Sequence, residues 1–432
     1  MNRNDPRMIA LDALMACLVD GKPLDETLER DRRLAGVEKR DRALVHAITA
    51  EVCRRRGQID ALIKGCLQKP LPAKAMLPRM ILRMGVAQLM FMDLAPHAAV
   101  STAVDLARVR VGAFANLVNA VLRRIQREGE AWMAEQDAAQ LNAPRWLMDS
   151  WTAAYGPETA HAIAAAHLER APLDLSVASD AAGWADKLDA RLLPTGGLRR
   201  AQSGQVEDMP GYGGGGWWVQ DVAASLPVRL LGDVRGQHIV DLCAAPGGKT
   251  AQLAAAGARV TAVDLSEKRL ERLKQNMWRQ KFEVETVVGD AVSWQPETPP
   301  DAVLLDSPCS GTGTIRRHPD IAWTKTQEDV TRLAYLQGRM IEHALSIVKP
   351  GGIVVCAVCS LQPEEGAEQF RALMARRTDI THLPVAPEEI SGLAEAIDGD
   401  GNLRTLPSLW PELAGMDGFH AMRLRRSGEA GT

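Results

Sequence analysis

The chain has 432 residues, of which 46% are hydrophobic and 24% charged, and its formal net charge is −3. This length predicts two or three domains with sizeable cores, and the composition excludes a largely disordered chain. No apolar run reaches the length of a membrane span, and seven scattered cysteines do not match a secreted disulfide scaffold, so we expect a cytoplasmic monomer with reduced thiols.

Residues 1–130 are predicted to form a compact helical domain, because apolar residues recur there at three- and four-residue spacings. They contain 22 Lys and Arg residues against 15 Asp and Glu, whereas the remainder contains 29 against 39. A basic domain beside an acidic remainder indicates a polyanionic partner such as RNA, although a solvated surface is the alternative. Within this domain the candidate RNA contacts are Arg54, Arg55 and Arg56.

Residues 131–216 read as a small mixed α/β segment, in which 172–178 alternates like a strand and the glycines of 211–216 form a loop. Residues 217–432 alternate β-rich runs with helical stretches, which predicts a doubly wound, Rossmann-like α/β domain. Helices are expected at 267–280 and 328–348, and a last strand, 418–424, at an edge of the sheet. The other predicted strands of this domain are 238–242, 259–263, 284–288, 302–305 and 353–358.

The first of these strands leads into a loop of small residues that opens a helix, which is where doubly wound sheets bind nucleotide-like ligands. Acidic residues end the strands: Asp241 ends the first, Asp264 the second and Asp306 the fourth, while Asp290 follows the third. A carboxylate at Asp264 can accept both ribose hydroxyls, and Asp290 can meet an adenine amino group. The loop and helix start that would hold the ligand are Cys243, Ala244, Ala245, Pro246, Gly247, Gly248 and Lys249.

The loop sequence argues against phosphate binding. A P-loop fits Gly248-Lys249-Thr250, but Cys243 occupies the position of its leading glycine. The Gly-x-Gly-x-x-Gly pattern that cradles a dinucleotide pyrophosphate is also absent from this loop. A cofactor without phosphates fits better, and S-adenosyl-L-methionine, with its adenine, ribose and amino-acid tail, is the one we expect.

Two cysteines lie at the ends of strands that we expect to be neighbours. Cys309 follows the fourth strand in Asp306-Ser-Pro-Cys, and Cys359 follows the fifth, so both thiols should face one crevice. Cys356 and Cys359 make a C-x-x-C spacing, but no second pair accompanies it and a strand would point the two to opposite faces. We therefore expect no metal site.

These motifs resemble those of the bacterial 16S ribosomal RNA cytosine-C5 methyltransferases of the NOL1/NOP2/Sun group that carry a NusB-like N-terminal domain. The resemblance rests on 241–250, on 306–313 with 316–320, and on 358–360. Residues 6–128 resemble the NusB-like domain, and 140–425 resemble the catalytic core. Ser307 and Val358 stand where the family usually has Ala and Thr, and Ser225 where a Gln is frequent.

The resemblance implies an enzyme that methylates a cytosine in small-subunit ribosomal RNA. Cys359 would add to C6 of the cytosine as nucleophile, and Cys309 would assist loss of the C5 proton and release of the enzyme. Asp306, with Lys249, would hold the N3 edge of the cytosine. Further RNA contacts are expected from the surface loop that contains Arg316, Arg317 and His318.

Two other functions remain open from the sequence. A DNA cytosine-C5 methyltransferase would use Cys309 of the Pro-Cys element as its nucleophile, and the presence of Cys359 favours RNA instead. A non-catalytic RNA-binding assembly factor would rely on the helical domain alone, and the intact cysteines and acidic strand ends argue against it.

Overall fold

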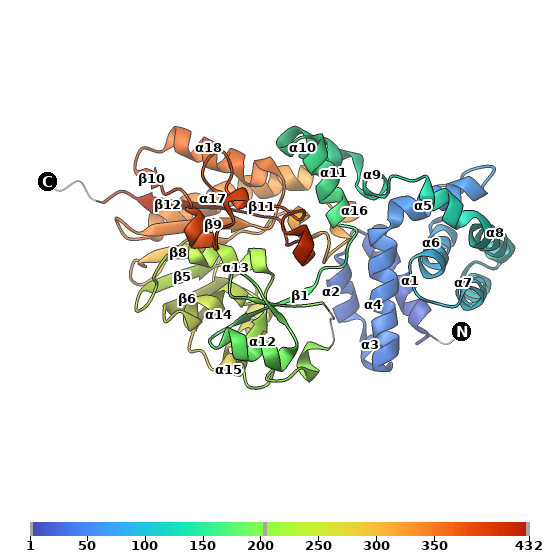
Figure 1. The fold of residues 1–432 in the computed structure, drawn as a ribbon, viewed down its shortest axis with the longest axis horizontal. Helices are drawn as coiled ribbons and strands as arrows, with labels where there is room; N and C mark the ends of the chain where they lie inside the picture. The colour runs from blue at the N-terminus through green and yellow to red at the C-terminus, as the bar shows by residue number, and fades with distance from the viewer. Residues whose placement is uncertain (1–2, 202–204, 429–432) are drawn as a thin grey trace. The chain divides into compact units, whose positions relative to one another are not determined.

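The computed structural model describes residues 3–201 and 205–428, and within them the chain forms two compact units (Figure 1). One unit comprises Met1–Arg170 with Ile315–Thr326, and the other comprises Ala171–Thr314 with Gln327–Thr432. Residues 131–216, which the sequence predicts to form a small mixed segment, divide between the two units at Arg170.

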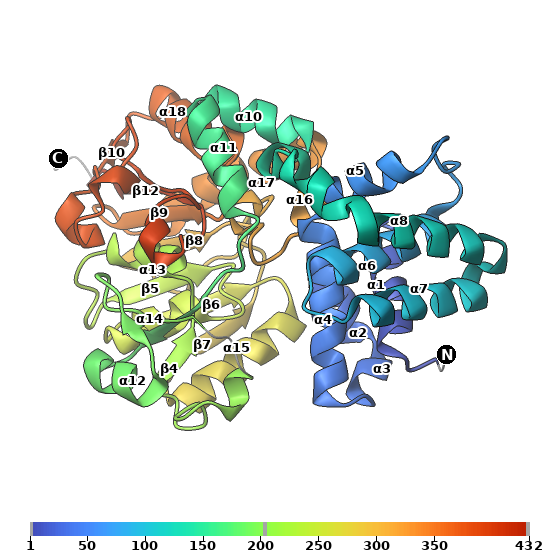
Figure 2. The ribbon, with the colours of Figure 1, turned by 45° about the vertical axis from the view of Figure 1, so that its right-hand side comes forward.

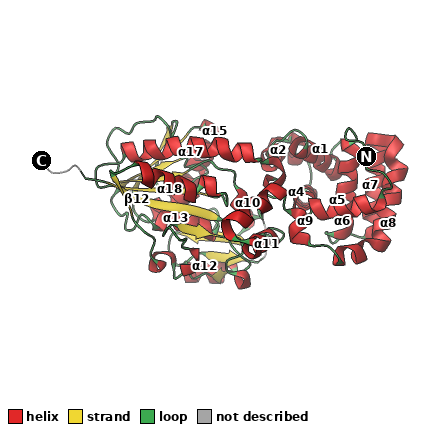
Figure 3. Cartoon of the chain, turned by 90° about the horizontal axis from the view of Figure 1, so that it is seen from above, coloured by secondary structure: helices red, strands yellow, loops and turns green. Residues whose placement is uncertain are grey.

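The first unit is helical, and Figure 3 shows its described residues as helices and loops. Its helices are amphipathic: in α8 (Ala115–Ala134) the buried residues Val118, Leu122 and Ile125 recur at helical spacing and join one core. The other helices of this unit are α1 (Pro6–Leu18), α2 (Leu24–Arg30), α3 (Arg32–Ala35), α4 (Lys39–Arg54), α5 (Arg56–Cys66), α6 (Met76–Met90), α7 (Pro96–Val111), α9 (Ala138–Asn142), α10 (Arg145–Tyr155), α11 (Pro157–Ala166) and α16 (Ile321–Thr324).

The second unit is built on a doubly wound sheet in the order β10-β12-β9-β8-β5-β6-β7, with β11 paired to β12. Strands β5 to β9 run parallel, and β12 is antiparallel to its neighbours. The strands are β5 (His238–Leu242), β6 (Arg259–Asp264), β7 (Glu285–Val288), β8 (Ala302–Asp306), β9 (Ile353–Val358), β10 (Ile380–His382), β11 (Leu403–Thr405) and β12 (Phe419–Arg426).

The last strand corrects one expectation. We predicted it at an edge of the sheet, but β12 lies between β9 and β10. The edge strand β10 has three residues and its sequence, Ile-Thr-His, gives too short an alternation to predict.

Alternate residues of each central strand face different helices, so both faces of the sheet are buried, as parallel sheets require. Ile239 and Leu304 pack into the core formed with α13 (Val222–Arg229) and α14 (Gly248–Ala255), and α15 (Glu267–Gln280) covers the same face at Ala262. Val240 and Val303 face the opposite core, formed with α17 (Gln327–Ile347) and α18 (Ala367–Arg376).

The second unit also contains a small antiparallel sheet in the order β2-β3-β1-β4, in which a buried ion pair joins β1 and β3. Arg199 of β3 donates to both carboxylate oxygens of Asp174 in β1 at 2.6 Å, and to the carbonyl of Gly415 at 2.7 Å. Asp174 also accepts from the backbone N–H of Val222, at 3.1 Å. The elements of this region are β1 (Leu173–Val177), α12 (Ala181–Leu188), β2 (Arg191–Leu192), β3 (Leu198–Arg200) and β4 (Trp217–Val219).

Replacing Arg199 with Met should destabilise the second unit by about 3–5 kcal/mol, because the carboxylate of Asp174 would stay buried without its cation. The urea midpoint, followed by tryptophan fluorescence, measures the change. Arg191→Met, on the neighbouring strand where the side chain is exposed, is the matched control. Equal midpoints for the two variants would show that the buried pair contributes little to stability.

Candidate active site

The carboxyl ends of the parallel strands bring the candidate residues to one edge of the sheet, and Figure 2 shows β5, β6, β8 and β9 side by side. Leu242 lies opposite both Val263 and Leu305. The same register continues into β9, where Asp306 lies opposite Ala357. The loops that leave these strands therefore start at one level, the position at which doubly wound sheets bind ligands.

The loop from β5 to α14, residues 243–247, turns tightly against α15. Cys243 and Gly247 have positive φ angles, 61° and 103°. A Cβ atom on Gly247 would lie 2.9 Å from Cγ of Leu273, so only glycine fits this position without a shift of its neighbour. Ala244 and Ala245 are small and buried, which leaves a loop whose backbone a ligand can approach closely.

Asp264, at the end of β6, fixes this loop. Its carboxylate accepts hydrogen bonds from the N–H of Ala245 at 3.2 Å and of Ser266 at 2.9 Å, and it lies 3.4 Å from the guanidinium of Arg269. A carboxylate has about four acceptor sites, so Asp264 retains capacity for a ligand hydroxyl. Asp290 is exposed and accepts from one backbone N–H in the turn after β7.

Asp241, within β5, connects this strand to the helix that follows it. It is fully buried, and one carboxyl oxygen accepts from the hydroxyl of Thr250 at 2.6 Å, which ties β5 to α14. Burial raises the pKa of Asp241 to about 7. Asp264 is also buried, at 3% exposure, whereas Asp306 is half-buried and Asp290 is exposed.

The structure brings the two cysteines together. The Sγ atoms of Cys309 and Cys359 lie 3.3 Å apart, and both side chains are half-buried. The hydrogen bond with Cys359 and burial, reinforced by the nearby carboxylate of Glu365, raise the pKa of Cys309 well above that of a free thiol. Cys243 lies apart from this pair, and burial raises its pKa to about 12.

Lys249 and Asp306 form an ion pair beside the thiols. Lys249 Nζ lies 2.7 Å from Oδ2 of Asp306 and 5.1 Å from the ring centroid of Phe419. Burial by itself lowers the pKa of Lys249, but attraction to Asp306 and to Cys359 outweighs it, so the pKa of Lys249 is raised. The ammonium group is thus held in its charged form next to Cys359.

The sequence patterns do not indicate Glu365 as a functional residue. In the structure it is buried between the two cysteine loops and accepts hydrogen bonds from Ser310 and Ser360. One feature of the sequence is related to this position. Each cysteine is followed by a serine, so the same Cys-Ser pair ends two neighbouring strand loops. What the sequence does not reveal is the shared acceptor.

The three arginines predicted to contact RNA, Arg54 to Arg56, have interaction partners within the helical unit. Arg54 is buried, 3.1 Å from a carboxylate oxygen of Glu51, and donates to the carbonyl of Arg316. Arg55 donates to the carbonyl of Leu168 and Arg56 stacks on the ring of Trp323, 4.6 Å from its centroid. Arg54 is enclosed within the unit, whereas Arg55 and Arg56 are half-buried, so an RNA contact by this cluster stays a prediction.

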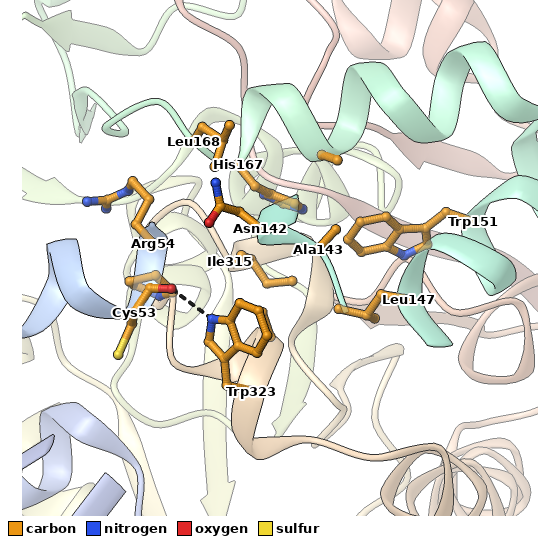
Figure 4. Close-up of a pocket in the computed structure, with 13 residues that line it drawn as sticks. Cys53, Arg54, Asn142, Ala143, Leu147, Trp151, His167, Leu168, Ile315 and Trp323 are labelled. Carbon is orange, nitrogen blue, oxygen red and sulfur yellow. Dashed lines mark hydrogen bonds between the residues drawn. The ribbon is translucent and has the colours of Figure 1, made fainter. Parts of the chain in front are cut away.

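Residues 315–326 are anchored in the helical unit, as Figure 4 shows. The indole N–H of Trp323 donates to the carbonyl of Cys53 at 2.7 Å, and the carboxylate of Asp320 accepts from the N–H of Leu24 at 3.1 Å. His318 lies 2.8 Å from the carboxylate of Asp25, and this hydrogen bond lowers the pKa of Asp25. Of the two other predicted contacts, Arg316 is buried and Arg317 is half-buried.

The pocket drawn in Figure 4 is too small for a ligand. Its lining side chains leave a cavity of about 10 Å³, room for one water at most. We therefore assign this region to packing.

Across residues 3–201 and 205–428, no group of three or more His, Cys, Asp or Glu side chains is placed to hold a metal ion. None of the helices that the structure describes combines the length and the apolar character needed to span a bilayer.

Family models of known proteins match a region of each unit. Residues 228–425 match the family model of the 16S rRNA methyltransferase RsmB/F, and residues 4–127 match that of the NusB family. Ribosomal RNA small subunit methyltransferase B of Cronobacter sakazakii is 34% identical over 91% of this chain and 96% of its own, and that of Pseudomonas putida is 36% identical over 89% and 92%. The solved structure of PH0851 superposes with a TM-score of 0.75 over 99% of both chains at 21% identity, which shows a shared fold.

Replacing Arg54 with Met should lower the stability of the helical unit by about 2 kcal/mol, since hydrogen bonds from a charged donor are lost. The salt dependence of RNA affinity should stay unchanged, because the Arg54 side chain is buried to all but 7% of its surface. Thermal unfolding and filter binding at several salt concentrations measure the two effects. A flatter plot of log affinity against log salt in this variant would restore Arg54 as a phosphate contact.

Proposed function

The chain belongs to the 16S rRNA methyltransferase RsmB/F family, and on this premise we propose that it methylates C5 of a cytosine in 16S ribosomal RNA. The methyl donor is S-adenosyl-L-methionine, and the reaction passes through a covalent bond between Cys359 and C6 of the cytosine. The observation that carries the proposal is the pair of thiols, 3.3 Å apart, at neighbouring strand ends beside the Lys249–Asp306 ion pair.

The cofactor site is the edge formed by the 243–249 turn, Asp264 and Asp290. Gly247 packs directly against Leu273 of α15, which keeps this turn tight and suits a loop whose backbone a ligand approaches closely. Spare acceptor sites on Asp264 suit the ribose hydroxyls, and Asp290 suits the adenine amino group. S-adenosyl-L-methionine supplies an electrophilic methyl group.

The cysteines of the chain activate and release the base. C5 of cytosine is a weak nucleophile until the Cys359 thiolate bonds to C6 and the electron pair of the C5–C6 double bond moves to C5, which then takes the methyl group. A base then removes the C5 proton, the electron pair of the C5–H bond re-forms the C5–C6 double bond, and the C6–S bond breaks with its pair on sulfur, which releases the Cys359 thiolate. Cys309, adjacent to Cys359, assists this last step.

The charges near the two thiols support this division of labour. The ammonium group of Lys249 stabilises a thiolate at Cys359, while the raised pKa of Cys309 keeps that group protonated and able to donate to its neighbour. Asp306, held by Lys249, is placed to accept from the cytosine edge. The target base must leave its stack to reach C6.

Asp264→Ala should weaken S-adenosyl-L-methionine binding by about 10- to 100-fold, because hydrogen bonds to a charged acceptor contribute about 1.5–3 kcal/mol. Titration calorimetry measures the affinity. Asp264→Asn, which retains one acceptor oxygen, should lose less. Glu267→Ala, exposed in the first turn of α15, is the matched control, and equal affinity for Asp264→Ala and this control would reject the ribose assignment.

The two cysteines should fail at different stages. Cys309→Ala should attack and methylate RNA but release it slowly, so a covalent protein–RNA adduct accumulates, whereas Cys359→Ala should form none. Denaturing gels of variants incubated with 16S RNA and S-adenosyl-L-methionine, with and without ribonuclease, detect the adduct. The reverse pattern would assign the attack to Cys309, as in the DNA-type mechanism.

A further inference from the structure

Glu365 is a buried carboxylate at the end of the short turn Pro363–Glu365, and only 3% of it is exposed. Its Oε1 accepts from the N–H of Ser310 at 2.8 Å and from Nε2 of Gln337 at 3.1 Å. Its Oε2 accepts from the hydroxyls of Ser310 and Ser360, each at 2.5 Å. Four donors match the acceptor sites of an ionised carboxylate, so the buried charge is well compensated.

These hydrogen bonds join the two cysteine loops to each other. Ser310 directly follows Cys309, and Ser360 directly follows Cys359. Backbone contacts add to the connection, since the N–H of Gly313 donates to the carbonyl of Cys359 at 3.0 Å. Glu365 is therefore the shared acceptor through which one loop holds the other.

The charges around the thiol pair are unequal on its two sides. Glu365 acts on Cys309, whereas Lys249, with Asp306 behind it, acts on Cys359. Arg404 is another charged residue close to the Cys359 loop, and its guanidinium donates to the carbonyl of Ser360 at 2.6 Å.

We propose that Glu365 is a positioning residue that holds both cysteine loops and, by its negative charge, directs thiolate formation to Cys359 rather than Cys309. This inference rests on the proposed covalent mechanism. A neutral amide at this position would have one acceptor oxygen for the four donors and would carry no charge. The carboxylate adds a field that disfavours a second negative charge at Cys309, and it thereby makes two similar thiols unequal.

The test compares the pH dependence of alkylation of the two thiols, which needs neither RNA nor cofactor. Purified protein is treated with iodoacetamide between pH 6 and pH 10.5, values chosen to span about two units on either side of a free thiol. The peptides that contain Cys309 and Cys359 are then quantified by mass spectrometry. In the parent protein, Cys359 should react at lower pH than Cys309.

Glu365→Gln should lower the alkylation midpoint of Cys309 by about one pH unit, the usual size of the effect of one nearby charge. Glu368→Gln, exposed on α18, controls for loss of a carboxylate in the same segment. Ser360→Ala removes one hydrogen bond and keeps the charge, so it should leave the midpoint of Cys309 in place. Circular dichroism verifies that each variant is folded.

Three results would overturn the proposal. These are an unchanged midpoint of Cys309 in folded Glu365→Gln, an equal shift in Ser360→Ala, or a lower midpoint for Cys309 than for Cys359 in the parent protein. The last comparison requires no variant, so it stands even if Glu365→Gln does not fold. Failure of methylation with the expected alkylation pattern would instead count against the proposed function.

Discussion

The hydrogen-bonded register between β8 and β9 determines where the reacting groups lie. Leu305 pairs with Cys356 and Asp306 with Ala357, so the two strands end within one or two residues of each other. The N–H of Ser307 then donates to the carbonyl of Ala357 at 3.0 Å, which extends the pairing past the end of β8. Since a shift of one residue would turn every side chain to the other face, this register also decides that both thiols emerge on the same side.

Given that register, the electrostatics of the site depend on one cation. Lys249 is buried, and a buried ammonium group persists only where nearby anions offset the loss of hydration. Asp306 provides that compensation directly, at 2.7 Å. Cys359 adds to this attraction, so the same carboxyl-terminal edge of the sheet that holds the two thiols also keeps Lys249 charged.

The sequence predicts the central sheet well because its strands are short apolar runs bounded by turn residues. Predicted strands 238–242 and 353–358 coincide with β5 and β9, and predicted helix 267–280 coincides with α15. The acidic strand ends and both cysteines follow from the same pattern. Topology then brings residues 50 apart in the chain to 3.3 Å, a proximity that adjacent parallel strand ends imply.

What the sequence does not predict depends on partners distant along the chain. A run of three arginines has the same composition whether it faces solvent or carbonyl groups, and Arg54 meets a carbonyl 262 positions away. Glu365 likewise gains its significance only when Ser310, 55 residues earlier, folds against it. Local periodicity contains no information on such pairings, so the sequence alone does not predict them.

The path of the chain adds a further constraint on how the two units act. The polypeptide leaves the second unit directly after the Cys309 loop, contributes residues 315–326 to the helical unit, and returns to form α17. Trp323 and Asp320 take their hydrogen-bond partners from α4 and from the start of α2. A protein lacking residues 1–130 would therefore expose the indole of Trp323 and leave Asp320 without its backbone donor, a few residues beyond Cys309. Any loss of function in such a truncation would combine the missing helices with a disturbed Cys309 loop, so single substitutions on the surface of the helical unit are the cleaner way to measure its role.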